Sequence, residues 1–174
     1  MGNRGVLHND SRDIVRRYAT RRWISCLLEF RGRWRAVMSP RRYTELFFLD
    51  EAVALAAGHR PCAECRRERF NAFKEAWIRS QDSPRAGFLY VDEMDLELHR
   101  ARMDGGRRKI TYRAPLRSLP DGCFVEIEGS GYLVWGEMLF LWSPAAYLSK
   151  LPRPADSDVA VLTPEPIVRC LRNG

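Results

Sequence analysis

Residues 57–65 read AGHRPCAEC, and this stretch places two of the chain's five cysteines in Cys-x-x-Cys spacing. Gly58 favours the end of a helix, and Pro61 favours a turn directly before Cys62. A tight turn of this kind lets two thiolates converge on one metal ion, as in zinc knuckles. A helix that starts beside Cys65 would also lower a thiol pKa, which is typical of redox sites. The stretch therefore predicts a zinc turn or a redox pair, with a metal-free turn held by packing as the third interpretation.

The residues around this turn predict a small module with a β-hairpin and two helices. Asp50 is suited to cap a short helix over residues 51–57, and apolar residues recur at helical spacing over residues 65–79. Residues 21–37, in which apolar residues alternate and Gly32 supplies a turn, predict the β-hairpin. Residues 43–49 predict a further strand.

The segment FFLDEAVALAAGHRPCAECRRERF, residues 47–70, resembles the second half of the Ada-type metal-binding domain. That domain is the zinc module of bacterial DNA methylphosphotriester repair proteins and of other DNA-associated proteins. The resemblance implies a structural zinc ion and an association with DNA. It is carried by Phe47, Phe48, Glu51, Ala52, Gly58, Arg60, Pro61, Cys62, Cys65 and Arg66, with His59 in a position that is aromatic in the family.

The upstream ligand pair of that family, which includes its methyl-acceptor cysteine, is not matched. Cys26 is the one cysteine before the turn, and Arg22 stands where the pair's first member would be. We therefore expect no methyl-acceptor repair activity. The predicted metal ligands are Cys62, Cys65, Cys26 and His8, with His59 as the alternative histidine. Cys26 also fits an apolar strand face, and Cys123 and Cys170 are expected in the core.

Positive charge is concentrated in the first half of the chain. Residues 1–80 hold 17 Arg and Lys against 9 Asp and Glu, whereas residues 81–174 hold 12 against 13. Arginine binds phosphate through two parallel hydrogen bonds, so we expect phosphate contacts from an arginine-rich hairpin and a nucleic-acid partner, with DNA favoured. A solvated basic surface and an acidic protein partner are the alternatives. The candidate contacts are Arg16, Arg17, Arg21, Arg22, Arg31, Arg33, Arg35, Arg41, Arg42, Arg66 and Arg67.

An enzymatic function is the alternative hypothesis. His99 lies in a predicted helix and is a candidate general base for a nucleic-acid-processing hydrolase. Cys62 and Cys65 are the candidate residues of a thiol-dependent enzyme. The sequence lacks a glycine-rich phosphate loop and a serine nucleophile motif, so a binding function is favoured over catalysis.

The whole sequence predicts an α+β protein of two modules. Residues 1–80 form the arginine-rich metal-binding module, 81–87 a linker, and 88–174 a β-rich module of barrel-like or curled-sheet form with a short helix at its end. The longest apolar runs are too short to cross a membrane, and five cysteines are an odd number for a disulfide framework. We therefore expect a bacterial cytoplasmic protein with no membrane partner.

Overall fold

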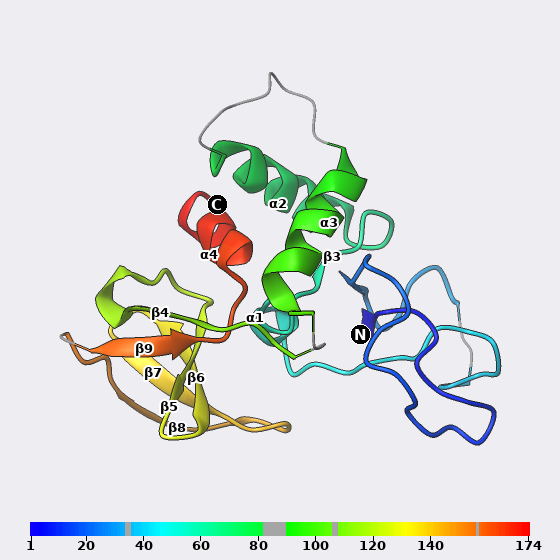
Figure 1. The fold of residues 1–174 in the computed structure, drawn as a ribbon, viewed down its shortest axis with the longest axis horizontal. Coiled ribbons are helices and arrows are strands. Elements are labelled where there is room, and N and C mark those ends of the chain that lie inside the picture. The colour runs from blue at the N-terminus through cyan, green and yellow to red at the C-terminus, as the bar shows by residue number, and fades with distance from the viewer. Residues whose placement is uncertain (34–35, 82–89, 106–107, 156) are drawn as a thin grey trace.

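The computed structural model describes residues 1–33, 36–81, 90–105, 108–155 and 157–174. It is an α+β structure in which a small mixed sheet with helices leads into a six-stranded antiparallel sheet (Figure 1). The predicted class is confirmed at this level. The predicted linker at 81–87 lies outside the described residues, apart from Gln81.

The small sheet joins three segments that are distant in the sequence. Its central strand β2 pairs with β1 in the antiparallel sense and with β3 in the parallel sense. Each strand is two residues long, so the sheet fixes where these segments meet while burying little surface by itself. The strands are β1 (Gly2–Asn3), β2 (Ile24–Ser25) and β3 (Arg60–Pro61).

The predicted hairpin over residues 21–37 does not form among its described residues, and residues 34 and 35 of its second strand lie outside the described part of the chain. The backbone of β2 pairs with β1 and β3 instead of with residues after Gly32. The alternation also failed as a sign of burial, because Leu28 on its apolar face is 72% exposed. Arg31 and Gly32 have positive φ angles and lie in a turn closed by a bond from Arg33 N to Phe30 O, yet the flanking described residues do not pair.

The strand predicted over residues 43–49 is reduced to one bridge. Leu46 and Gly2 exchange two backbone hydrogen bonds, and no further ladder forms among the described residues around them. Thr44 N donates to Gly5 O on the same side. This segment therefore lies against the N-terminal residues without forming a regular strand.

The predicted helices are present. Asp50 caps the first helix by accepting a hydrogen bond from Val53 N at 2.8 Å, and Gly58 follows that helix with φ +82°. Such an angle favours glycine because a side chain would be strained there. The described helices are α1 (Glu51–Ala56), α2 (Arg67–Arg79), α3 (Val91–Arg102) and α4 (Glu165–Arg172), with a 3-10 turn at Leu116–Ser118.

The second half of the chain builds an open sheet with strand order β4-β9-β5-β6-β7-β8. No pairing joins the edge strands β4 and β8 in the part of the chain that the structure describes, so the sheet is neither closed nor curled into the predicted barrel. The edge strand β8 is largely exposed. The strands are β4 (Tyr112–Pro115), β5 (Phe124–Ile127), β6 (Ser130–Trp135), β7 (Met138–Trp142), β8 (Tyr147–Pro152) and β9 (Asp158–Val161).

Helix α4 connects the two hydrophobic layers, and Figure 1 shows it between the sheet and helices α2 and α3. Ile167 and Cys170 pack with the buried face of α2 and α3, which includes Trp77. Val168 packs instead with the sheet, in a cluster that contains Cys123. The predicted core positions of Cys123 and Cys170 are thereby confirmed. No described helix has both the length and the apolar character to cross a bilayer.

Candidate metal centre

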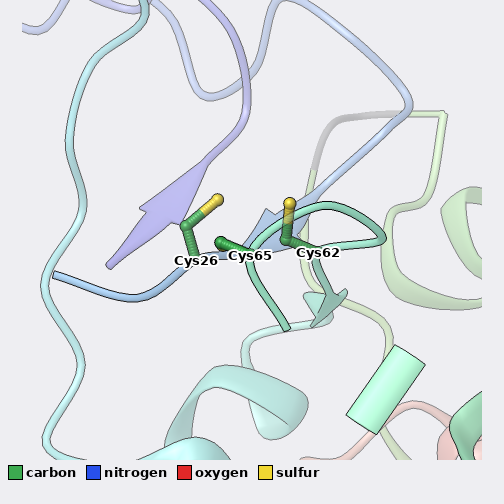
Figure 2. A group of neighbouring side chains, drawn as sticks. All are labelled: Cys26, Cys62 and Cys65. Atoms are coloured by element: carbon green, nitrogen blue, oxygen red, sulfur yellow. The ribbon is translucent and has the colours of Figure 1, made fainter. Parts of the chain in front are cut away.

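Strand pairing brings three cysteines together. In the parallel pair of β2 and β3, Ser25 lies opposite Pro61, so the next residues, Cys26 and Cys62, leave neighbouring strands at the same end. Cys65 follows in the turn before α2. The three sulfur atoms lie within 4.8 Å of one another, and Figure 2 shows the side chains next to each other. Residues 26 and 62–65 thus form one cluster.

Backbone hydrogen bonds hold this cluster and point toward its sulfur atoms. Cys62 N donates to Ser25 O at 2.9 Å, which continues the pairing of β2 and β3 up to the cluster. Leu27 N donates to the sulfur of Cys65, and Glu64 N donates to the sulfur of Cys62, both at 3.4 Å. Bonds of this kind stabilise a negative charge on sulfur, which metal ligation requires.

The three thiols do not ionise alike. A hydrogen bond from the Cys26 thiol lowers the pKa of Cys62 to about 5, against an opposing effect of burial. The same bond, together with burial, raises the pKa of Cys26 above its usual range. Burial raises the pKa of Cys65. Cys62 is therefore the cysteine of the cluster that loses its proton at the lowest pH, and the Cys26 thiol donates a hydrogen bond to it.

The donor set fits a soft metal ion. Two sulfur atoms bound to one tetrahedral zinc ion at about 2.3 Å each lie about 3.8 Å apart, which falls inside the 4.8 Å limit on the separations of these three sulfur atoms. Thiolates favour zinc or copper(I) over hard cations such as magnesium. Three clustered cysteines can therefore hold a metal ion such as zinc.

Neither predicted histidine belongs to this cluster. Among the described residues, the potential ligands that come together are the three cysteines alone. His8 is buried, and its Nδ1 lies 2.6 Å from the hydroxyl of Thr44. His59 is also buried, between the rings of Phe48 and Trp23. Both histidines were predicted as ligands from their residue type and their place in the sequence. Tertiary packing places His8 against Thr44 and His59 against aromatic rings instead.

His59 belongs to the packing of the first half of the chain. Its Nε2 accepts a hydrogen bond from Arg4 Nε at 3.2 Å. Burial, followed by the charges of Arg4 and Arg102, lowers the pKa of His59 well below its usual value. The ring is therefore neutral near pH 7 and acts as an acceptor for Arg4.

A buried ion pair fixes the strand that leads into the cysteines. Arg60 donates two hydrogen bonds to the carboxylate of Asp95 on α3, both at 2.8 Å, and both side chains are nearly inaccessible to solvent. The guanidinium of Arg60 also lies over the ring of Phe70. The ion pair could not be predicted from the sequence, because the residues around Arg60 give no sign of a partner 35 positions away.

A cavity of about 460 Å³ adjoins the cluster, and we call it the cysteine pocket. All three cysteines line it, together with apolar side chains such as Leu28 and Phe47. Glu64 lies between the two cysteines of the turn, and its Oε1 forms an ion pair with Arg33 Nη2 at 2.8 Å. Both of these exposed side chains line the cysteine pocket. Glu64 was not predicted as a site residue from the sequence, although its place within CAEC was the available signal.

The candidate arginines lie mostly on exposed loops instead of on a hairpin. Three candidates form ion pairs: Arg22 with Asp92, Arg33 with Glu64, and the half-buried Arg66 with Glu51. Arg35 lies outside the described residues, and Arg17 is exposed. The remaining candidates are exposed and form no ion pair with any described residue; they are Arg16, Arg21, Arg31, Arg41, Arg42 and Arg67.

His99 faces aromatic and cationic groups. Its ring meets Tyr18 edge-on with centroids 4.8 Å apart, and its Nδ1 lies 3.4 Å from Arg102 Nη2. Burial, followed by the charges of Arg102 and Arg21, lowers its pKa. The His99 ring is therefore neutral near pH 7. Among the described residues, the contacts of the ring are with Tyr18, Trp23 and Arg102, and none of these is a carboxylate that would support a general base.

The fold and the cluster thus define a class: an α+β protein with three cysteines that can hold a metal ion. Comparison of the chain with protein-family models, curated proteins and solved structures found no match. The resemblance to the Ada-type domain therefore stays a prediction that rests on residues 47–70.

Proposed function

We propose that the protein binds zinc through Cys26, Cys62 and Cys65 and uses its exposed loop arginines to bind nucleic acid, with DNA as the favoured partner. The observation that carries the metal proposal is the convergence of three sulfur atoms within 4.8 Å, from segments 36 residues apart in the chain. A fourth ligand would reach the ion from the cysteine pocket, because the two histidines lie elsewhere.

Zinc would have a structural role in this proposal. The loops on either side of Cys26 contain little regular structure, and β1, β2 and β3 are two residues long. An ion that joins Cys26 to the turn at Cys62 would fix these loops to the helices. Arginines on them would then be held for phosphate contacts without the predicted hairpin.

The metal part is tested by elemental analysis of the purified chain. We expect about one zinc ion per chain, and Cys62→Ala and Cys26→Ala should each lose most of it. Cys123→Ala is the matched control, since Cys123 is a buried cysteine of the sheet core and should leave the zinc content unchanged. A wild-type protein without zinc, or equal loss in the control, would contradict the metal proposal.

The nucleic-acid part is tested by the salt dependence of binding to a short DNA duplex. Removal of one arginine that binds a phosphate should reduce the slope of log K against log salt by about 0.9. Arg41→Met combined with Arg42→Met should therefore reduce it by up to about 1.8, because both side chains are exposed and form no ion pair with a described residue. Lys150→Met, on the exposed strand β8, is the control. A slope near zero for the wild type would refute phosphate binding, and tighter binding to an acidic protein would favour that alternative.

A further inference from the structure

A second cavity, of about 430 Å³, lies where the first half of the chain meets the six-stranded sheet. Arg4, Trp23 and Ala57 line it from the first half, and Phe124 and Trp142 line it from the sheet. We call it the basic cavity. Its volume is within the range of small-molecule sites, which often lie between structural units. None of the three clustered cysteines lines it.

The charge of this cavity is unbalanced. Arg4, Arg102 and Lys109 line it, and the acid in its described lining is Glu126, which is exposed. No described carboxylate forms an ion pair with any of the three cations. Asp95, the acid that acts on Arg102, already binds Arg60 through both oxygens. Three positive charges therefore meet one negative charge.

Neutral backbone groups hold these cations in place. Arg102 Nη1 donates to Gly58 O and Lys109 Nζ to Ala56 O, each at 2.7 Å, while Arg4 Nη2 donates to Ala57 O at 3.4 Å. Burial of its ammonium end lowers the pKa of Lys109 to about 8, with Arg4 and Arg102 adding to the shift, although the residue as a whole is exposed. Carbonyl oxygens at the end of α1 thus position the cations without cancelling their charge.

Trp23 orders the two guanidinium groups further. The guanidinium carbons of Arg4 and Arg102 lie 3.9 and 4.0 Å from its ring centroid. Stacking on an aromatic ring fixes the plane of a guanidinium. Burial lowers the pKa of Arg4 to about 10 and that of Arg102 to about 9, so both groups stay charged at pH 7. The basic cavity is therefore built from pre-ordered cations instead of mobile surface side chains.

Two buried donors at this cavity have no partner. Arg102 is 1% exposed, and its Nε has no hydrogen-bond acceptor among the described residues. The indole Nε1 of Trp142 is in the same state. Buried donors in proteins nearly always find an acceptor, so an unmade bond calls for a specific explanation. Both nitrogen atoms are covered by neighbouring protein atoms, so a ligand in the cavity would reach them only if lining side chains move.

We propose that the basic cavity binds a small organic anion, in which a phosphate or carboxylate group is attached to an apolar body. The anionic group lies toward Arg4, Arg102 and Lys109, and the apolar body lies against Phe124 and the other apolar side chains of the lining. A simple inorganic ion would leave those walls uncovered, and a neutral aromatic compound would leave the cations unbalanced. This inference is independent of the proposed zinc and nucleic-acid function.

Three probes that share one ring system separate charge from shape: 1-naphthyl phosphate, 1-naphthoate and 1-naphthalenemethanol. Each is titrated into the full chain by isothermal titration calorimetry. We expect at least one of the two anions to bind at least tenfold more tightly than the alcohol. The stronger of the two anions identifies the phosphate or the carboxylate as the preferred group.

Two variants test whether the probe binds in this cavity. Lys109→Met should weaken binding of the preferred anion about tenfold, and Glu126→Gln should strengthen it severalfold, because it removes the one opposing charge. Neither should change binding of the alcohol. Lys150→Met, on β8 and outside the lining, is the control and should change nothing. Glu126→Gln alters an exposed side chain, so it keeps the test valid even if Lys109→Met fails to fold.

The inference is overturned if no anion binds at millimolar concentration, or if the alcohol binds as tightly as both anions. It is also overturned if Glu126→Gln leaves anion affinity unchanged. Loss of zinc or of DNA binding in separate experiments has no bearing on it, because the cysteines and the exposed loop arginines do not line this cavity.

Discussion

The ion pair between Arg60 and Asp95 is the contact that we expect to matter most for stability near the cysteines. Arg60 is the second residue before Cys62, and Asp95 lies on α3. Their side chains are 3% and 4% exposed, and two hydrogen bonds of 2.8 Å join them. Asp95→Asn keeps the shape of the side chain but removes its charge.

The structure allows an estimate of the cost. Removal of one partner leaves the other charge buried and unpaired, which typically costs about 3–5 kcal/mol of unfolding free energy. Glu64→Gln is the matched control, because Glu64 binds Arg33 at the same 2.8 Å but both side chains are more than half exposed. An exposed pair contributes about 0–1 kcal/mol. The loss of unfolding free energy should therefore be severalfold larger for Asp95→Asn than for Glu64→Gln.

Urea unfolding followed by circular dichroism measures both losses. We also expect the double variant Arg60→Met with Asp95→Leu to be less destabilised than Asp95→Asn, since it leaves neither partner of this ion pair buried without the other. A loss below about 1 kcal/mol for Asp95→Asn, equal to that of Glu64→Gln, would refute the reasoning that burial makes this pair important.

Two further predictions concern the helix end and pH. Gly58→Ala should lower the unfolding free energy by about 1–2 kcal/mol or more, because φ is +82° and the added Cβ would lie 2.7 Å from Arg102 Cδ. Gly105→Ala is the control, since nothing lies within 4 Å of the Cβ that it adds. An equal loss of melting temperature in the two variants would contradict this prediction. Stability should fall as pH drops below about 6.5, because unfolded His59 then binds a proton that the buried ring does not, at up to about 1.4 kcal/mol per pH unit. Urea titrations from pH 7.5 to 5 should show a shallower decline in His59→Gln, and an unchanged decline would exclude His59 as the cause.

Local chemistry in the sequence predicted much of the fold. Asp50 and Gly58 mark the ends of the first helix, and helical spacing of apolar residues predicted α2 with its buried Phe70 and Trp77. Capping groups and periodic apolar residues act within a few positions of the chain, so they can be recognised without the tertiary structure. The Cys-x-x-Cys half of the cysteine cluster was predicted on the same basis.

Long-range pairing could not be predicted in this way. The alternation over residues 21–37 is the pattern of a hairpin, yet the backbone of β2 binds segments about 20 residues before it and 36 residues after it. The sequence also favoured a barrel for the second half, where the structure has an open sheet. Strand order depends on which distant partners bury the most surface, and local alternation contains no information about them.

By itself, the sequence determined that the chain is α+β, that its positive charge lies in the first half, and that Cys62 and Cys65 share a turn. Only the tertiary structure decided that Cys26 joins them, that His8 and His59 do not, and that Arg4, Arg102 and Lys109 line one cavity. The physical reason is that turns and helix ends depend on neighbouring residues. A ligand cluster or a charged cavity depends on the parallel pairing and packing of segments far apart in the chain.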